Sequence, residues 1–165
     1  MNFRLVSFLG ALACIGGLAF ALFTQYVLGF EPCPMCIFQR VAMAATGVFF
    51  ILGAIHGPSG WGRWIYALLA LLASAIGAGI AARHVWLQSL PPDLVPACGP
   101  TLDYLLEFLP VSEVISMVLY GDGNCAKIDA QWLGISLPGW TFMGFVALGI
   151  YALLTPIVSR RKATF

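Results

Sequence analysis

Four long apolar runs dominate the chain, and shorter polar segments separate them. The runs cover about residues 8–29, 38–56, 64–82 and 138–158. About 20 apolar residues are enough for a helix to cross the hydrocarbon core of a bilayer. The pattern therefore predicts an all-α membrane protein, built as a bundle of four transmembrane helices.

The first run could also be the apolar core of a cleaved signal peptide. Arg4 precedes it, and Ala19-Phe20-Ala21 resembles a signal-peptidase site. Signal-peptide cores are about 7–15 residues long, however, and this run stays apolar beyond the candidate site. We therefore expect the run to remain in the protein as an uncleaved membrane anchor.

The composition agrees with a membrane location. Of the 165 residues, 61% are hydrophobic and 9% are charged, and the mean hydropathy is +0.93. Soluble domains carry about 25% charged residues. We expect residues 1–165 to form a single integral membrane domain in the lipid bilayer. The formal net charge of +1 gives no indication of nucleic-acid binding.

The charges are distributed unequally between the two sides of the predicted bundle. Six of the seven acidic residues lie between residues 85 and 136, and the seventh is Glu31. The opposite side carries only basic residues, namely Arg4, Arg63, Arg160, Arg161 and Lys162. The positive-inside rule then predicts that both termini and the turn at 57–61 are cytoplasmic. The loops at about 30–37 and 83–137 face outward.

The long second loop contains two short helical patterns. Residues 102–109 read as a helix that Pro110 ends, and residues 111–120 place apolar side chains at helical spacing. The second helix is too short to span a bilayer, so it fits an interfacial amphipathic helix lying on the membrane. A loop helix that packs on the bundle is the alternative. The turn at 121–124 then leads to Cys125.

Four of the five cysteines fall in the outward loops, and only Cys14 lies inside a predicted span, as a small buried apolar residue. Cys33 and Cys36 form a Cys-x-x-Cys pair, which an oxidising compartment favours as a reversible disulfide. A structural staple is the weaker interpretation, because so small a loop loses little chain entropy on closing.

A zinc site is also disfavoured by the spacing of the cysteines. Four-cysteine zinc sites usually bring their ligands as two close pairs. Cys98 and Cys125 are separated by 26 residues, which fits a disulfide that closes the loop. We therefore expect no metal site. Such a disulfide could be attacked by a soluble partner's thiol, or it could be a structural bridge.

Arg40 lies four residues after Cys36, close to the start of the second apolar run. If the helix begins near Cys36, this spacing places both side chains on one helix face. A cation and a helix N-terminus both favour a reactive thiolate at Cys36. The alternative is an arginine that extends toward lipid headgroups.

No dinucleotide-binding, haem or iron–sulfur pattern is present, so the electron acceptor is expected to be a diffusible membrane molecule such as a quinone. Arg40 could donate a hydrogen bond to a quinone oxygen, and Gln39 could add another nearby. His84 lies at the end of the third run. A histidine at this place is commonly an interfacial or capping residue, and the alternative is a role in the reaction.

These residues together resemble the disulfide bond formation protein B family. The likeness rests on the four spans, the Cys-x-x-Cys loop, Arg40 and the two cysteines of the second loop. The stretches 123–126 (Gly-Asn-Cys-Ala) and 131–134 (Gln-Trp-Leu-Gly) are also similar to the family. The resemblance implies a four-helix bundle in the bacterial inner membrane, with the redox cysteines on the periplasmic side.

The resemblance also implies an activity. The protein would reoxidise a periplasmic thioredoxin-like thiol oxidase of the DsbA type and pass the electrons to ubiquinone or menaquinone, diffusible and not covalently bound. Cys98 would form the mixed disulfide with the partner, and Cys125 would exchange with Cys33. Cys36 would react with the quinone beside Arg40.

The family also has a histidine near the quinone, and His84 takes about that position. Pro34-Met35 at the centre of the motif departs from the family and is expected to tune the redox potential. One rival is a protein similar to the vitamin K epoxide reductase group, whose Cys-x-x-Cys pair lies toward the far end of its bundle. Another is a disulfide-stapled accessory membrane protein without enzymatic activity.

Overall fold

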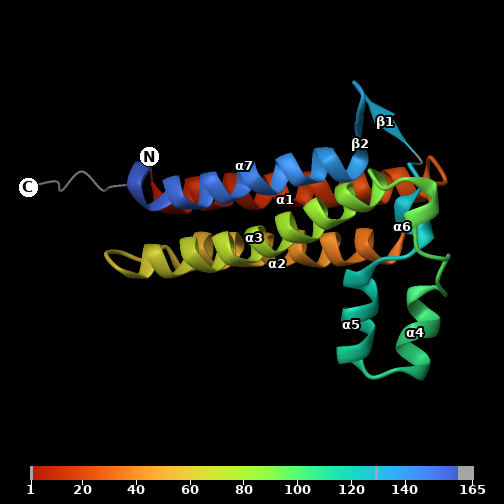
Figure 1. Ribbon diagram of the computed structural model, residues 1–165. Coiled ribbons are helices and arrows are strands. Elements are labelled where there is room, and N and C mark those ends of the chain that lie inside the picture. Colours follow the sequence, from red (N-terminus) through yellow and green to blue (C-terminus); the bar gives the residue numbers. More distant parts are fainter. Residues whose placement is uncertain (1, 129, 160–165) are drawn as a thin grey trace, which may run out of the picture.

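The computed structural model describes residues 2–128 and 130–159, and four long helices lying side by side form most of it (Figure 1). All four are long and apolar enough to cross a membrane. They are α1 (Phe3–Tyr26), α2 (Pro34–His56), α3 (Gly62–Gln88) and α7 (Leu137–Val158). The predicted all-α bundle of four membrane helices is confirmed.

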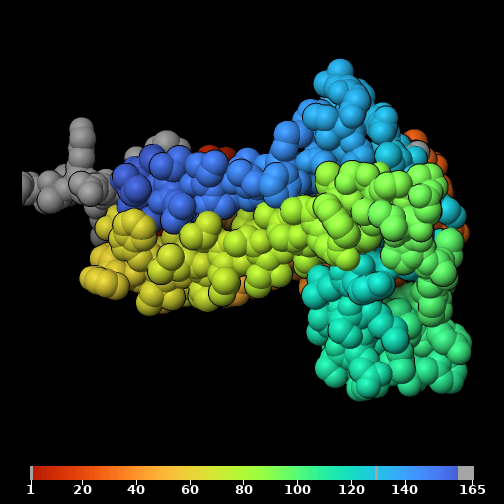
Figure 2. Space-filling view, viewed as in Figure 1, coloured from red at the N-terminus to blue at the C-terminus, as the bar shows by residue number. Residues whose placement is uncertain are grey.

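The connection between α3 and α7 forms a separate lobe at one end of the bundle (Figure 2). It contains the 3₁₀ helix η1 (Pro92–Leu94), the helices α4 (Leu102–Phe108), α5 (Val111–Tyr120) and α6 (Gly123–Ala126), and the strands β1 (Gln131–Trp132) and β2 (Ile135–Ser136). The two strands pair antiparallel, with Trp132 opposite Ile135. Both predicted loop helices are present.

Three of the long helices extend beyond the apolar runs, and the first of them, α1, begins at Phe3, before the run that starts near residue 8. α2 already begins at Pro34, directly after Cys33, and α3 continues to Gln88, past the end of the run near residue 82. The last two turns of α3 carry polar side chains that bind the backbone of the lobe. Arg83, for example, donates to the carbonyl oxygens of Leu119 and Tyr120.

Close contacts between small residues and satisfied hydroxyl groups hold the helices together. The Ser74 hydroxyl donates to the Phe145 carbonyl oxygen at 2.7 Å, and the Tyr151 hydroxyl donates to the Val6 carbonyl oxygen at 2.6 Å. Gly77 makes room for Phe145, since a Cβ atom there would lie 2.3 Å from its ring. Such packing is typical of helices in lipid, where water cannot satisfy polar groups.

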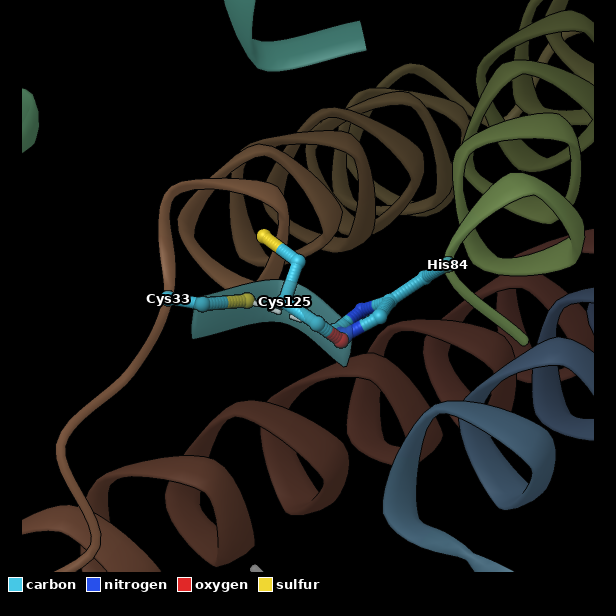
Figure 3. Close-up of side chains that lie close together, drawn as sticks. All are labelled: Cys33, His84 and Cys125. Carbon is cyan, nitrogen blue, oxygen red and sulfur yellow. Dashed lines mark hydrogen bonds between the residues drawn. The ribbon is translucent and has the colours of Figure 1, made fainter. Parts of the chain in front are cut away.

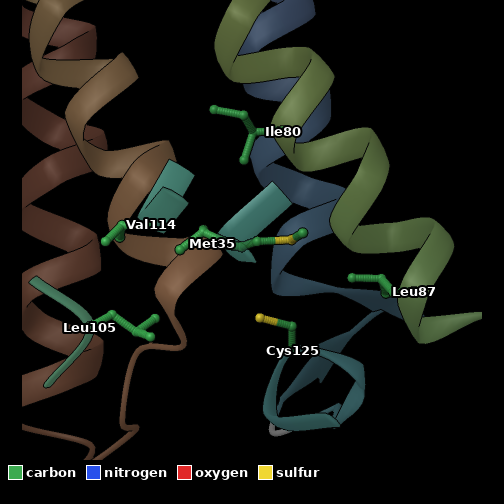
Figure 4. Close-up of a cluster of buried hydrophobic side chains, with 7 residues drawn as sticks. Met35, Ile80, Leu87, Leu105, Val114 and Cys125 are labelled. Atoms are coloured by element: carbon green, nitrogen blue, oxygen red, sulfur yellow. The ribbon is translucent and has the colours of Figure 1, made fainter. Parts of the chain in front are cut away.

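A second core lies between the bundle end and the lobe (Figure 4). It is formed by buried side chains from both parts, namely Met35, Ile80, Leu87, Leu105, Val114, Val118 and Cys125. α5 contributes two of these, whereas its Val111 and Ile115 are exposed. This corresponds to a loop helix that packs on the bundle; that α5 also lies on the bilayer stays a prediction.

The bundle places Arg4 and Arg63 at the end opposite the lobe. Arg4 is in the first turn of α1 and its side chain lies against Gly57, where α2 ends, while Arg63 is at the start of α3. Figure 1 shows the start of α1 at the same end of the bundle as the α2–α3 turn. Arg160, Arg161 and Lys162, on which the charge asymmetry also relied, lie outside the described residues.

Candidate functional site

The first turn of α2 positions the Cys-x-x-Cys pair. Cys33 is the N-cap residue, and Pro34 occupies the first turn, where its missing N–H leaves no helical hydrogen bond unmade. The backbone N–H of Cys36 points at the Cys33 sulfur, 3.4 Å away. The two Sγ atoms are 3.2 Å apart and both thiols are free. A small movement would therefore close a disulfide between them.

Cys125 is brought to this pair by α6. The Asp122 carboxylate caps α6 by accepting a hydrogen bond from the Cys125 N–H at 3.0 Å. The Cys125 side chain is 1% exposed. Its sulfur, the Cys33 sulfur and a ring nitrogen of His84 all lie within 4.8 Å of one another (Figure 3). Residues far apart in sequence therefore form one cluster.

Because Cys33 and Cys125 lie close together, their pKa values shift in opposite directions. A hydrogen bond from the Cys33 thiol stabilises the Cys125 thiolate, so the pKa of Cys125 lies below its usual value. The same hydrogen bond, together with one to Cys36 and burial, raises the pKa of Cys33. A thiolate is the nucleophile in thiol–disulfide exchange. In the reduced protein Cys125 is thus the member of this pair that carries the thiolate.

His84 lies at the centre of the cluster and is 2% exposed. Its Nε2 atom is 3.0 Å from the Cys125 carbonyl oxygen and 3.8 Å from the Cys33 sulfur. A carbonyl oxygen only accepts, so Nε2 carries the hydrogen and Nδ1 accepts from the Gln39 amide, 3.1 Å away. His84 therefore belongs to the thiol cluster, and Gln39 contacts the cluster through its hydrogen bond to His84.

The end of α3 holds the Cys125 segment through its backbone. Arg83 binds the last carbonyl oxygens of α5, and the Gln88 amide donates to the Lys127 carbonyl oxygen at 3.2 Å. Gly121 has φ +86°, and a Cβ atom there would lie 2.2 Å from Leu87. These contacts on both sides of α6 fix Cys125 over Cys33. Sequence reasoning missed them, because backbone acceptors leave no pattern in the sequence.

Arg40 lies on the other side of Cys36. Its guanidinium donates to the Gln25 side-chain oxygen and to the Ala21 carbonyl oxygen, the latter at 3.0 Å. A mostly apolar cavity of about 270 Å³ opens here between α1, α2 and α7. Cys36, Gln39 and Arg40 line it together with apolar side chains that include Met43 and Trp140. Gln25 was detectable in the sequence as a rare polar residue in an apolar run.

Cys98 is the exposed member of the set. Its segment runs along α6, where the Gly123 N–H donates to the Ala97 carbonyl oxygen at 3.1 Å. A Cβ atom at Gly123 would lie 2.7 Å from the Pro96 carbonyl oxygen and 3.2 Å from the Cys98 sulfur, and the first distance is too short for any residue but glycine. The structure therefore joins Cys33, Cys36 and Cys125 with His84, and places Cys98 at the accessible edge.

This arrangement provides for thiol–disulfide exchange. One sulfur is accessible, two more are close to each other, and the fourth borders an apolar cavity with a guanidinium at its wall. Disulfide exchange needs neighbouring sulfurs, at least one of them as a thiolate. The site supplies both requirements.

Comparisons with known proteins agree with this chemistry. Residues 3–155 match the family described as Disulfide bond formation protein DsbB. Disulfide bond formation protein B of Chromohalobacter salexigens is 50% identical over 165 residues, covering 98% of this chain and 96% of its own. The protein of that name from Xanthomonas euvesicatoria is 48% identical over 163 residues, covering 98% and 95%. The one from Nitrosococcus oceani is 46% identical over 153 residues, covering 93% and 90%.

Proposed function

The chain belongs to the DsbB family of disulfide bond formation proteins, a family of membrane disulfide oxidoreductases, and from that premise we propose that it is a thiol:quinone oxidoreductase. It takes two electrons from a thioredoxin-like thiol oxidase of the DsbA type and delivers them to a membrane quinone. The observation that carries the proposal is the position of Cys36. Its sulfur is 3.2 Å from that of Cys33, and its side chain borders the Arg40 cavity.

The cavity beside Cys36 fits the head group of ubiquinone or menaquinone. Its walls are mostly apolar, as an aromatic or quinonoid ring requires, and the Arg40 guanidinium supplies hydrogen-bond donors for a ring oxygen. A bound quinone supplies an acceptor of two electrons and two protons. Arg40 stabilises negative charge beside it, and Gln25 together with the Ala21 carbonyl holds the guanidinium in place.

The soluble partner meets the protein at Cys98. A groove of about 580 Å³ lies beside this exposed cysteine, lined by Pro96, Gly99 and Pro100 on one side and by Met117 and Tyr120 of α5 on the other. An apolar groove next to an accessible sulfur suits the extended segment around a partner's reactive thiol. We assign this groove to the DsbA-type partner.

The electrons then pass along the cysteines in pairs. The partner's thiolate attacks the Cys98–Cys125 disulfide at Cys98 and releases the Cys125 thiolate. That thiolate attacks the Cys33–Cys36 disulfide at Cys33, so a Cys33–Cys125 bond forms and the Cys36 thiolate is released beside the cavity. The partner's second thiolate attacks the partner's own sulfur in the mixed disulfide, so the oxidised partner leaves and Cys98 becomes a thiolate. Cys98 then attacks the Cys33–Cys125 bond at Cys125, which restores the Cys98–Cys125 disulfide and frees Cys33. Cys33 and Cys36 would re-form their disulfide as two electrons and two protons pass to a bound quinone.

Four groups support the exchange between Cys125 and Cys33. His84 donates to the Cys125 carbonyl oxygen and Asp122 accepts from its N–H, so the backbone of the nucleophile is held from both sides. The N-terminus of α2 and Arg40 stabilise the negative charge that appears on Cys36. The hydrogen bond from the Cys33 thiol is absent while Cys33 is in a disulfide, but the Met35 backbone and His84 also lower the pKa of Cys125, and they remain.

The proposal includes an orientation in the bacterial inner membrane. The lobe and its cysteines face the periplasm, and both termini face the cytoplasm. In support, Arg4 and Arg63 share the bundle end opposite the thiol cluster. Basic residues beside membrane helices are enriched on the cytoplasmic side.

Thiol trapping with and without quinone tests the proposed function. The protein is reduced, freed of reductant and placed in lipid nanodiscs, and its free thiols are alkylated and counted by mass. With one equivalent of added ubiquinone, we expect two thiols to become resistant to alkylation, and with excess ubiquinone four, because Cys98 and Cys125 then pass their electrons through Cys33 and Cys36. A stapled accessory protein would give the same thiol count with and without quinone, and that result would refute the proposal.

A further inference from the structure

We propose that the fully reduced protein binds one Zn²⁺ ion in its thiol cluster, a role that goes beyond electron transfer. The ligands are three thiolates and one imidazole, from Cys33, Cys36, Cys125 and His84. The ion occupies the same sulfurs that exchange disulfides. Zinc binding and disulfide formation therefore exclude each other.

The spacing of the ligand atoms suits this ion. The sulfurs of Cys33 and Cys125 and a ring nitrogen of His84 lie within 4.8 Å of one another, and the Cys36 sulfur is 3.2 Å from that of Cys33. In a tetrahedral zinc site the ligand atoms are about 3.4–3.8 Å apart, given Zn–S near 2.3 Å and Zn–N near 2.0–2.1 Å. Cys33, Cys125 and His84 are thus within small side-chain movements of three zinc positions, and the Cys36 side chain has to turn toward them to supply the fourth.

The surroundings favour a soft, thiophilic cation. Cys125 is 1% and His84 is 2% exposed, so the ion would be largely shielded from competing water. A hollow of about 70 Å³, lined in part by Cys33, Cys36 and His84, borders the cluster and gives access to it. Thiolate and imidazole ligands select Zn²⁺ over hard cations such as Mg²⁺ and Ca²⁺.

The charges also balance. Coordination releases the three thiol protons, and three thiolates with one Zn²⁺ leave a net charge of −1 on the cluster. Arg40, which lines the same hollow, offsets this charge. No electron moves in this step, since the metal stays divalent and the sulfurs stay reduced. In the oxidised protein the sulfurs are in disulfides and no longer offer thiolates.

Gln39 is placed to support the histidine ligand. Its amide nitrogen is 3.1 Å from Nδ1 of His84. Turning the amide by half a rotation presents its oxygen instead, which accepts a hydrogen from Nδ1 and leaves Nε2 free for the metal. Zinc-bound histidines usually donate their second ring N–H in this way. The Cys125 carbonyl gives up its bond from Nε2 in exchange.

The sequence had suggested no metal site, because Cys98 and Cys125 are too far apart to form a close pair. In the structure His84, and not Cys98, lies with the other candidate ligands. These come from the start of α2, the end of α3 and α6. Only the folded chain brings these positions together.

A titration with Co²⁺ and Zn²⁺ tests the proposal on the whole protein in nanodiscs, without quinone or partner. We expect the reduced protein to bind one Co²⁺ with the visible absorption of a tetrahedral thiolate site, and Zn²⁺ to displace it. The oxidised protein should bind none. Absence of these bands in the reduced protein, or equal binding after oxidation, would overturn the proposal.

Variants identify the ligands. Cys125→Ser and His84→Ala should each weaken Zn²⁺ binding more than the roughly 10–100-fold typical of a lost outer-shell partner, and Gln39→Leu should fall within that range. Cys14→Ser, a cysteine buried in the bundle, is the matched control and should bind within twofold of the parent. Binding that persists in Cys125→Ser but disappears in Cys98→Ser would assign the metal elsewhere. Because quinone is absent throughout, this outcome is independent of the proposed electron transfer.

Discussion

At the scale of single residues, Arg40 connects the thiol cluster to the membrane side of the molecule. Its guanidinium spans from α2 to the Gln25 side chain and the Ala21 carbonyl of α1, and it borders the same cavity as Cys36. A lysine would keep the charge but lose the planar fork that makes several directed hydrogen bonds at once. Arg40 is therefore the residue at which the proposed quinone site is most easily disturbed.

We expect Arg40→Lys to lower kcat/KM for quinone about 10–100-fold, mainly through KM, because a hydrogen bond to a charged group contributes about 1.5–3 kcal/mol. The measurement is quinone reduction in nanodiscs with a saturating small dithiol as electron donor. Arg63→Lys, at the opposite end of the bundle, is the matched control and should be unchanged. An Arg40→Lys protein with the parent's KM would show that Arg40 does not contact the quinone.

Cys125 gives a prediction on pH. Its pKa is lowered chiefly by the hydrogen bond from Cys33. The thiolate therefore persists at a pH at which an ordinary thiol is already protonated. In a variant that keeps only Cys33 and Cys125, thiolate absorbance should be retained to lower pH than in one that keeps only Cys125. Equal midpoints in the two variants would contradict the assigned hydrogen bond.

At the scale of elements, the end of α3 acts as a platform for the lobe. Its last turns bind the end of α5, the α6 backbone and the Lys127 carbonyl, and Leu87 lies tightly against Gly121. The Arg83 guanidinium also stacks on Trp86, 4.1 Å from the ring centre. The reactive position of Cys125 thus depends on a helix distant from it in sequence.

Replacing Arg83 with Gln should loosen this platform. Losing two hydrogen bonds to the end of α5 should slow formation of the Cys33–Cys125 disulfide about tenfold, since about 1.4 kcal/mol corresponds to a factor of ten. The rate is measured by mild oxidation of a variant that keeps only these two cysteines. Lys127→Gln removes a cation of the lobe but no hydrogen bond to α5, and it should leave the rate unchanged. An unchanged rate in Arg83→Gln would show that Arg83 does not position Cys125.

The elements themselves were largely predictable, whereas their ends were not. Hydropathy is a local property, so the apolar runs and the 111–120 helix follow directly from the sequence. The hydropathy signal ends at Arg83 and His84, because it cannot detect that loop carbonyls will satisfy these polar residues. The role of His84 as a contact of both Cys33 and Cys125 was invisible for the same reason.

At the scale of the whole molecule, the sulfurs form a path from the surface to the membrane cavity. Cys98 is exposed, the sulfurs of Cys125 and Cys33 lie within 4.8 Å of each other, and Cys36 borders the cavity between α1, α2 and α7. The sequence predicted the four cysteines and Arg40 as members of one site. That Cys125 meets Cys33 was implied only by the family resemblance, because residue spacing does not show how the lobe folds back on the bundle.

The most direct test of this account is quinone turnover by Cys36→Ser protein supplied with a reduced thioredoxin-like partner. Cys36 is the only one of these cysteines that borders the cavity within the described residues, so we expect the variant to reduce no quinone. Cys14→Ser, which removes a buried sulfur inside the bundle, should turn over at the parent rate. Quinone reduction by Cys36→Ser at the rate of the parent protein would contradict the proposed route.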